Sequence, residues 1–399
     1  MFIGYKVNFL INATNSSDLK FGRLYLNQIS DMIHIPENIQ ELKSYKPGKP
    51  LPQIIKELNL SEVAVLWNNE NNFGPSPRAL ECIAKATPNS HLYPDPVCTE
   101  LRTLLAKKWN RSFDEVAVGN GSESIFNNLF NAFFKEGEEL LTCEGTFVAV
   151  YIWAKANNVK VSTVPLNQKF GFDLDALLGS INDKTKAIYL SNPNNPTGAM
   201  IAEQDLVEFI EKVPEHILII VDEAYYEFAN DLGVDYPNSA NYKYENVLTL
   251  RTFSKAYGIA AIRIGYAIGH SKLIEAIMKV KLTFEPSNLA QAAGIGALSD
   301  FEYLEKTISN NTSEIQKYYA VFKELDLEYI PSYGNFVMLN LKTEGIVQYY
   351  FEELMKMGVF VRPLKAFGLS HCLRITVGLP EENELCFKAL RKLAAVSAK

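Results

Sequence analysis

Three short apolar runs place the tightest limit on the fold. They are KAIYL (186–190), HILIIV (216–221) and NVLTL (246–250). Each has the length of a strand and, after its first residue, contains only apolar or β-branched residues, which is typical of strands buried on both faces of a mainly parallel sheet. Stretches with apolar residues at helical spacing, such as 98–109 and 124–134, alternate with strand-like runs. This alternation predicts an α/β fold, with helices covering a mainly parallel sheet.

The pattern changes in the C-terminal part of the chain. A loop and long helices are expected over about 282–325, and three short strands and a closing helix follow them. We therefore expect a large α/β domain over 67–311 and a smaller α+β domain over 312–399. Residues 1–31 are interpreted as an extension, and 32–66 as a segment that packs on the small domain. An alternative is that Met32 is the true start.

Composition excludes several classes of function. The 399 residues are 47% hydrophobic and 21% charged, as in an ordinary globular protein. The net charge of −7 argues against nucleic acid or an anionic membrane as the main partner. No apolar run approaches the length of a membrane span. The five cysteines are scattered without CxxC spacing, and the five histidines show no ligand spacing, so we expect a cytoplasmic protein with reduced thiols and no metal site.

Polar residues follow the predicted strands, where ligands bind in open α/β sheets. In VAVGNGSES (116–124), Gly119 and Gly121 precede a helix that opens at Ser122. Glycines before a helix N-terminus can form an anion site from backbone N–H groups. A plain strand–helix connection with a serine cap fits this turn equally well.

Two further strand ends carry polar side chains. SNPNNPTG (191–198) forms a rigid turn that either holds an asparagine against a ligand or is simply a stiff loop. Asp222 and Glu223 end the HILIIV run, and a carboxylate at that depth needs a cation or a hydrogen-bond donor. A buried salt bridge or a helix cap would also satisfy it.

The fourth strand end is RTFSKAYGIAAIRIGY (251–266). It places Lys255 alone among small and apolar residues, with Arg263 eight residues later. A lysine in such surroundings has a lowered pKa and can act as a nucleophile, although a lone lysine often extends along a helix face to water. The small residues between the two cations, Gly258 among them, predict close approach of the backbone to a ligand.

Together these features match the needs of pyridoxal phosphate. The lysine would form a Schiff base, and Asp222 would pair with the protonated pyridine nitrogen, which makes the ring an electron sink. The glycine turn, with Thr252, Ser254 and Arg263, would hold the phosphate.

The motifs SNPNNPTG, DEAY and RTFSKAYGIAAIRIGY together resemble those of fold type I pyridoxal-phosphate aminotransferases, over nearly all of 32–399. The segments SYKPGKP (44–50), NENNFGPSP (69–77) and LYPDP (92–96), with GNGSES, VRP and LRITVG, are most similar to the histidinol-phosphate aminotransferase subfamily. The resemblance implies amino transfer to a 2-oxo acid such as 2-oxoglutarate, in histidine biosynthesis. It also implies a homodimer with shared active sites.

The resemblance also implies roles for individual residues. The catalytic residues would be Lys255, Asp222 and Tyr225. The cofactor would be bound by these three and by Asn195, Phe147, Gly121, Ser122, Glu123, Thr252, Ser254 and Arg263, with Tyr93 reaching the phosphate in the neighbouring subunit. The substrate would be bound by Tyr45, Asn69, Arg362 and Arg374.

Arg362 and Arg374 bear on the choice of substrate. One bidentate arginine suffices for the carboxylate of an amino acid, whereas two arginines suit a dianionic phosphate. A surface ion pair is the alternative for Arg362. Asn72 stands where the family usually has proline, and Trp67 where a smaller residue is commoner, so both bear on substrate identity.

Other functions fit the same scaffold. They are an aminotransferase for aromatic amino acids, a decarboxylase of a phosphorylated amino acid, and a non-catalytic sensor module. The sensor module would need a DNA-binding domain, and 1–40 contains no basic helix-turn-helix pattern.

Overall fold

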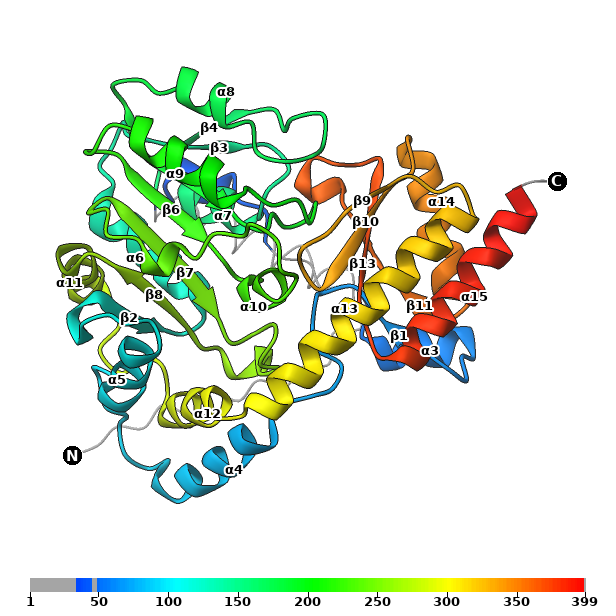
Figure 1. The fold of residues 1–399 in the computed structure, drawn as a ribbon, viewed down its shortest axis with the longest axis horizontal. Helices are drawn as coiled ribbons and strands as arrows, with labels where there is room; N and C mark the ends of the chain where they lie inside the picture. Colours follow the sequence, from blue (N-terminus) through cyan, green and yellow to red (C-terminus); the bar gives the residue numbers. More distant parts are fainter. Residues whose placement is uncertain (1–33, 45–48, 398–399) are drawn as a thin grey trace, which may run out of the picture. The chain divides into compact units, whose positions relative to one another are not determined.

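The computed structural model describes residues 34–44 and 49–397. Contacts divide the chain into two units, Met1–Ser44 and Tyr45–Lys399. The described part of the first unit contains the short helix α2 (Glu37–Gln40). All the elements described below belong to the second unit (Figure 1).

A seven-stranded sheet forms the larger part of the second unit, in the order β2-β8-β7-β6-β5-β3-β4. All neighbouring strands are parallel except at β8, which is antiparallel to β7 and β2. The predicted α/β class with a mainly parallel sheet is therefore confirmed. The strands are β2 (Val116–Gly119), β3 (Glu139–Cys143), β4 (Lys160–Val164), β5 (Thr185–Ser191), β6 (Leu218–Asp222), β7 (Val247–Thr252) and β8 (Gly265–Gly269).

Helices cover both faces of this sheet because successive side chains on a strand point to opposite faces. On β5, Ala187 and Tyr189 pack with one helix layer, and Ile188 and Leu190 pack with the other. The first layer is α6 (Ser122–Phe133), α7 (Ala149–Ala156) and α11 (Ser271–Val280). The second is α5 (Thr99–Lys108), α8 (Leu174–Gly179), α9 (Glu203–Lys212) and α12 (Asn288–Leu298), with α4 (Pro77–Ala86) packed on α12.

A second, antiparallel sheet is built from the C-terminal part of the chain, in the order β12-β13-β10-β9. Its strands are β9 (Tyr329–Ile330), β10 (Phe336–Asn340), β12 (Arg362–Pro363) and β13 (Cys372–Thr376). The helices α14 (Glu344–Lys356) and α15 (Pro380–Ser397) contribute to the same hydrophobic core. β1 (Ala64–Val65) pairs in parallel with β11 (Val359–Phe360), and Ala64 and Leu66 enter that core. α3 (Leu51–Leu58) precedes β1.

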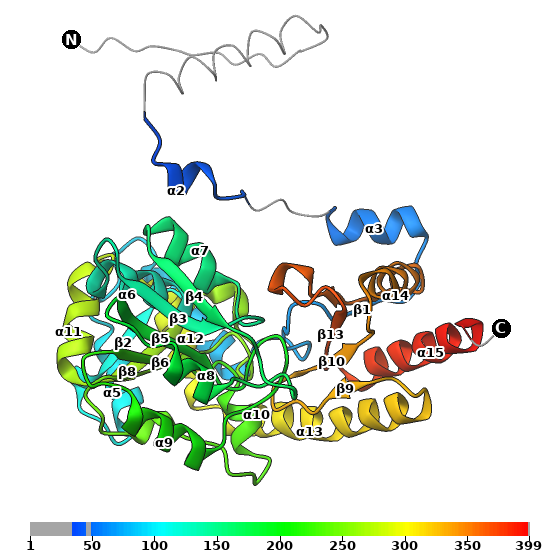
Figure 2. The ribbon, with the colours of Figure 1, turned by 90° about the horizontal axis from the view of Figure 1, so that it is seen from above.

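One long helix links the two sheets. α13 (Phe301–Glu324) contacts α10 (Tyr226–Asn230), which follows β6, and it also contacts β10 and α15 (Figures 1 and 2). The helix continues without a break through the boundary predicted between 311 and 312. The division of the chain at 66/67 and 311/312 remains a prediction.

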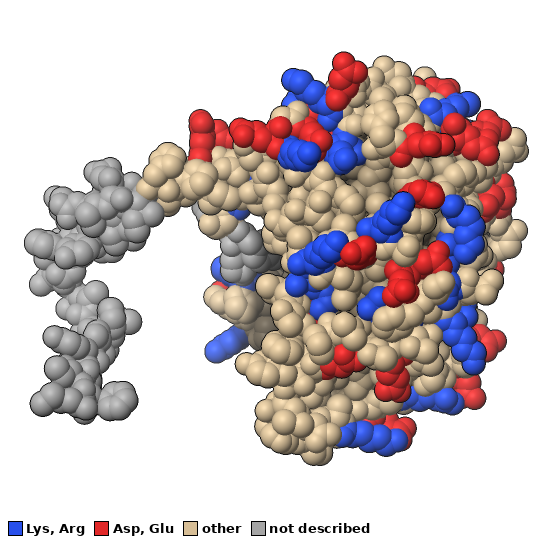
Figure 3. All heavy atoms as spheres, turned by 90° about the vertical axis from the view of Figure 1, so that its left-hand side faces the viewer, with Lys and Arg blue, Asp and Glu red and all other residues tan. Residues whose placement is uncertain are grey.

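Charged side chains of both signs are interspersed on the face shown in Figure 3, so that face carries no extended field of one sign. Among the described residues, no helix is both long and apolar enough to cross a membrane. The same residues contain no group of three or more His, Cys, Asp or Glu side chains arranged to hold a metal ion.

A buried ion pair joins β7 to the turn that follows β6. Arg251 Nε donates to Glu223 Oε2 at 3.0 Å, and both side chains are buried. The guanidinium lies between two aromatic rings, 4.0 Å from the Trp109 centroid and 3.4 Å from the Tyr226 centroid. Asp222 directly precedes Glu223, and Thr252 directly follows Arg251. The ion pair therefore fixes the position of these two predicted site residues.

We expect Glu223→Gln to lower the free energy of unfolding by about 3–5 kcal/mol, because it leaves the Arg251 charge buried without its partner. Urea unfolding followed by circular dichroism measures the change. Glu81→Gln is the matched control, since it breaks an exposed pair with Lys85 and should leave the free energy of unfolding almost unchanged. Equal small losses in both variants would contradict a stabilising role for the buried pair.

Candidate active site

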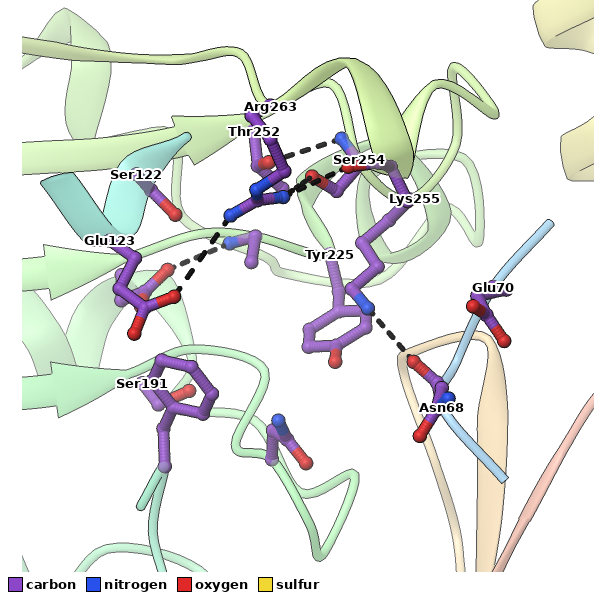
Figure 4. Close-up of a pocket in the computed structure, with 15 residues that line it drawn as sticks. Asn68, Glu70, Ser122, Glu123, Ser191, Tyr225, Thr252, Ser254, Lys255 and Arg263 are labelled. Carbon is purple, nitrogen blue, oxygen red and sulfur yellow. Dashed lines mark hydrogen bonds and ion pairs between the residues drawn. The ribbon is translucent and has the colours of Figure 1, made fainter. Parts of the chain in front are cut away.

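A cavity of about 220 Å³ opens at the C-terminal ends of β5, β6 and β7, beside the N-terminus of α6 (Figure 4). Ten residues predicted from the sequence line it: Ser122, Glu123, Phe147, Asn195, Asp222, Tyr225, Thr252, Ser254, Lys255 and Arg263. Ala260, one of the small residues expected between Lys255 and Arg263 to approach a ligand, also lines it. Four further lining residues were not predicted: Asn68, Glu70, Ser191 and Ala224.

Lys255 lies in the turn after β7 and points into this cavity (Figure 4). Its Nζ donates to the carbonyl oxygen of Asn68 at 3.1 Å and lies 5.9 Å from the centroid of the Tyr225 ring. Burial, and next the nearby charge of Arg374, lower the pKa of Lys255 to about 8. A substantial fraction of the amine is therefore neutral near neutral pH and able to act as a nucleophile or a base.

Asp222 is the last residue of β6, and its carboxylate is buried. The Tyr189 hydroxyl donates to Oδ2 at 2.8 Å, and the backbone N–H of Ala224 donates to Oδ1 at 3.2 Å. Burial raises the pKa of Asp222 to about 6 even though both donors favour the charged form. This carboxylate therefore suits a cationic ligand atom. The role of Tyr189 was missed, because only the pairing of β5 with β6 places its hydroxyl beside Asp222.

The N-terminus of α6 forms an anion cradle with Arg263. The first N–H groups of the helix, from Ser122 and Glu123, have no acceptor within the helix. Gly121 has a φ of +80°, and a Cβ there would lie 2.6 Å from an Arg263 nitrogen, so only glycine lets the guanidinium approach. Arg263 Nη1 also lies 3.4 Å from the Ser254 hydroxyl, and Thr252 completes the cavity wall.

These groups fit the cofactor expected from the sequence. An amine, a buried carboxylate and an anion cradle match the aldehyde, the ring nitrogen and the phosphate of pyridoxal phosphate. The Phe147 ring, the Asn195 amide and the Tyr225 hydroxyl, all on the cavity wall, offer a π-face and hydrogen bonds for the pyridine ring. The Glu123 carboxylate, by contrast, stands 4.0 Å from Arg263 and accepts from Trp153 Nε1 at 3.2 Å.

The two predicted substrate arginines stand opposite each other. Arg362 on β12 pairs in register with Arg374 on β13, so the two residues lie on neighbouring strands. Arg374 is buried and donates to Asn195 Oδ1 and, at 2.8 Å, to the Trp67 carbonyl oxygen. Arg362 is exposed and donates to Asn68 Oδ1 at 2.6 Å. Both therefore border the cavity through its wall residues Asn195 and Asn68.

Asn69 and Asn72 make structural contacts. Asn69 Nδ2 donates to the Tyr225 hydroxyl at 2.9 Å. Asn72 donates to both carboxylate oxygens of Glu382, at 2.8 and 2.7 Å, and so connects its loop to the start of α15. Trp67 is half-buried with its ring against Phe360, 5.4 Å between centroids. None of Asn69, Asn72 and Trp67 is among the residues that line the cavity.

The remaining predicted positions lie elsewhere. Tyr45 and the 1–31 extension are outside the described residues. Tyr93 does not line this cavity; its ring is 80% exposed and stacks on Phe284 at 4.2 Å. The prediction for Gly258 was wrong: a Cβ there would lie 2.3 Å from the Gly74 carbonyl oxygen, so the small residue makes room for another loop of the chain and not for a ligand.

Comparison with known proteins agrees with this geometry. The model of the family described as aminotransferase class I and II matches residues 61–390, so the chain belongs to that family. Histidinol-phosphate aminotransferase 1 of Bacillus cereus is 39% identical over 363 residues, which are 90% of this chain and 97% of the relative. Histidinol-phosphate aminotransferase 2 of Pseudomonas fluorescens is 37% identical over 90% of this chain and 96% of the relative.

Solved structures show the same fold. Histidinol-phosphate aminotransferase from Sinorhizobium meliloti in complex with pyridoxal-5′-phosphate superposes with a TM-score of 0.81 and 27% identity, covering 91% of this chain and 98% of that one. Aspartate aminotransferase from Thermus thermophilus with maleate gives 0.79 and 25% identity, over 92% of this chain and all of that one. The predicted family and fold type I architecture are thereby confirmed.

We expect Lys255 in the cofactor-free protein to titrate near pH 8, well below the ordinary lysine value of 10.5. Below this pH the amine is mostly charged and unreactive, and above it the amine is mostly neutral. Trace acetylation across a pH series, read by mass spectrometry of the peptide that contains Lys255, measures the midpoint. The urea-unfolded chain is the control, and identical midpoints in the folded and unfolded chains would contradict the lowered pKa.

Proposed function

We propose that this protein is a cytoplasmic, pyridoxal-phosphate-dependent aminotransferase that moves an amino group between histidinol phosphate and 2-oxoglutarate, in histidine biosynthesis. The observation that carries the proposal is the facing pair Arg362 and Arg374 at the edge of a cavity that contains Lys255. The names of the relatives and the structural neighbour that binds pyridoxal phosphate support the same function.

Each part of the cofactor has residues suited to hold it. The phosphate would be held by the N–H groups of Ser122 and Glu123 with Arg263, Ser254 and Thr252, all of which line the cavity. Pyridoxal phosphate supplies an aldehyde that reacts with amines and a ring that accepts electrons from the substrate. Asp222 would pair with the ring nitrogen, Asn195 and Tyr225 would bind the ring hydroxyl, and Phe147 would stack on the ring.

Lys255 is the residue that moves the proton. The pKa of its amine is about 8. Both the neutral form, which acts as a base, and the charged form, which acts as an acid, are therefore available near neutral pH, as general acid–base catalysis requires. Lys255 would take the proton from the α-carbon of the bound substrate, hold it on Nζ and release it again as an acid. The Asn68 carbonyl holds the amine in the free protein and is the acceptor that Lys255 leaves when it acts.

The two arginines bind the anionic end of the substrate. Arg374 is buried, and its Nε has no partner among the described residues, so its guanidinium has a free N–H. Arg362 is exposed, and it must give up its hydrogen bond to Asn68 in order to bind the ligand. Two guanidinium groups together offer more N–H donors than the oxygens of one carboxylate can use. A phosphate dianion can use these additional donors.

The proposed assembly is a homodimer. Large apolar side chains are exposed along 92–97 and 282–284: Leu92 (59%), Tyr93 (80%), Val97 (40%), Leu282 (72%) and Phe284 (46%). Such a grouping of exposed apolar side chains is typical of a protein interface. In a dimer with shared sites, Tyr93 would bind the cofactor phosphate of the partner subunit.

A half-reaction screen tests the function. The cofactor-loaded protein is mixed with one amino donor at a time, namely histidinol phosphate, phenylalanine, tyrosine or threonine phosphate, and the visible absorbance of the bound cofactor is followed. We expect histidinol phosphate to react fastest, because its phosphate engages both arginines. Lys255→Ala should give no turnover. A fast response only to an aromatic amino acid would refute the substrate assignment.

The same assay tests the arginine pair. Arg362→Gln should raise KM for histidinol phosphate about tenfold to a hundredfold, the range expected for a lost hydrogen bond to a charged group. Arg391→Gln is the matched control, because Arg391 is an exposed arginine on α15 whose partner is Glu324. An unchanged KM in Arg362→Gln would remove this residue from the proposed phosphate site.

The proposed dimer is tested by Leu282→Asp, which places a charge within the exposed apolar group. We expect this variant to shift the molar mass toward that of one chain in size-exclusion chromatography with light scattering. Ile346→Asp is the control, because Ile346 is 43% exposed on α14. A wild-type protein that elutes as a single chain would contradict the dimer.

A further inference from the structure

One carboxylate in the cavity wall makes no hydrogen bond and no ion pair within residues 34–44 and 49–397. Three acidic residues line the cavity. Asp222 accepts from Tyr189 and Ala224, and Glu123 accepts from Trp153 and faces Arg263. The exposed side chain of Glu70 makes no hydrogen bond and no ion pair within the described part of the chain.

Glu70 is close to the reacting groups. It follows Asn68 by two residues, and Asn68 bonds Lys255 through its carbonyl and Arg362 through its side chain. The negative charge of Glu70 favours the charged form of Lys255, which places its carboxylate within electrostatic reach of that amine. Figure 4 shows Glu70, Asn68 and Lys255 grouped at one side of the cavity.

Groups of opposite character therefore border the cavity near Asn68. Arg362 and Arg374 offer N–H donors to an anion, whereas Glu70 offers only acceptors when it is charged. A substrate that satisfies both kinds of group carries an anionic group and an N–H donor in addition to its amine. A phenyl ring in the same place would leave the Glu70 carboxylate facing an apolar group, which is unfavourable once water is excluded.

We propose that Glu70 is a specificity-determining residue that accepts a hydrogen bond from the ring N–H of an imidazole-bearing substrate. The inference rests on the proposed function and deepens it, because it assigns the residue that recognises the heteroaromatic ring. In its charged form Glu70 also attracts the protonated imidazole, so it selects for this ring over a phenyl ring of similar size.

A second role for Glu70 gives a different result. If Glu70 only sustained the charge of Lys255, its removal would change the rate with every amino donor by the same factor. If Glu70 binds the ring, its removal affects only donors whose ring has an N–H group. The ratio of kcat/KM between two donors with the same amine and phosphate separates these roles.

The test compares histidinol phosphate with phenylalaninol phosphate, which keeps the amine and the phosphate but replaces the imidazole by phenyl. Both donors are given to the cofactor-loaded wild-type protein and to Glu70→Gln. Glu62→Gln is the matched control. Glu62 is an exposed glutamate that shortly precedes Glu70 in the sequence, and it does not line the cavity. Fluorescence titration of cofactor binding to the cofactor-free variants checks that the cradle is intact.

We expect Glu70→Gln to lower the wild-type preference for histidinol phosphate about tenfold, because the glutamine amide oxygen still accepts a hydrogen bond but lacks the charge that strengthens it. Most of the change should appear in KM for histidinol phosphate, with cofactor affinity unchanged and Glu62→Gln like wild type. Equal changes for both donors, or no change, would overturn the role of Glu70 and leave the proposed function standing. A wild-type protein that does not convert histidinol phosphate would overturn both.

Discussion

The hydrogen bonds of the short segment 67–72 hold the site together. The Trp67 carbonyl accepts from Arg374 on β13, and Asn68 bonds both Lys255 and Arg362. Asn69 bonds Thr376 on β13 and Tyr225 after β6, and Asn71 donates to the Ala256 carbonyl beside Lys255. Six consecutive residues thus connect the ends of the seven-stranded sheet with the antiparallel sheet. The cavity has its shape because this segment crosses between them.

Burial pushes the two central ionisable groups of the cavity toward their neutral forms. The carboxylate of Asp222 has a raised pKa and the amine of Lys255 a lowered one. In both cases loss of water is the largest cause. A ligand that brings a cationic ring nitrogen to Asp222 restores the charged form of the carboxylate. The free protein is therefore arranged to interact more strongly with a charged ligand than with water.

Much of the fold and the cofactor site could be predicted from the sequence, because the signals are local. Continuous apolar runs marked β5, β6 and β7, and the turns at the ends of these runs supplied the cavity residues Asn195, Asp222 and Lys255. The contributions of Tyr189, Asn68 and Glu70 could not be predicted, because they depend on which strands are neighbours and where the 67–72 segment crosses. The environment of Gly258 could not be predicted either, because Gly74, whose carbonyl oxygen lies next to it, is distant in sequence.

The register of β12 against β13 has a further consequence for the arginine pair. Residues directly opposite each other in antiparallel strands have Cα atoms about 4.5–5.5 Å apart and side chains on the same face. The sheet therefore fixes the base of both side chains, and the spacing of their Cα atoms does not depend on loop conformation. The two strands thus set the distance between the two arginines. A compact group with several oxygens can bind both arginines across this distance, whereas a single neutral hydroxyl cannot.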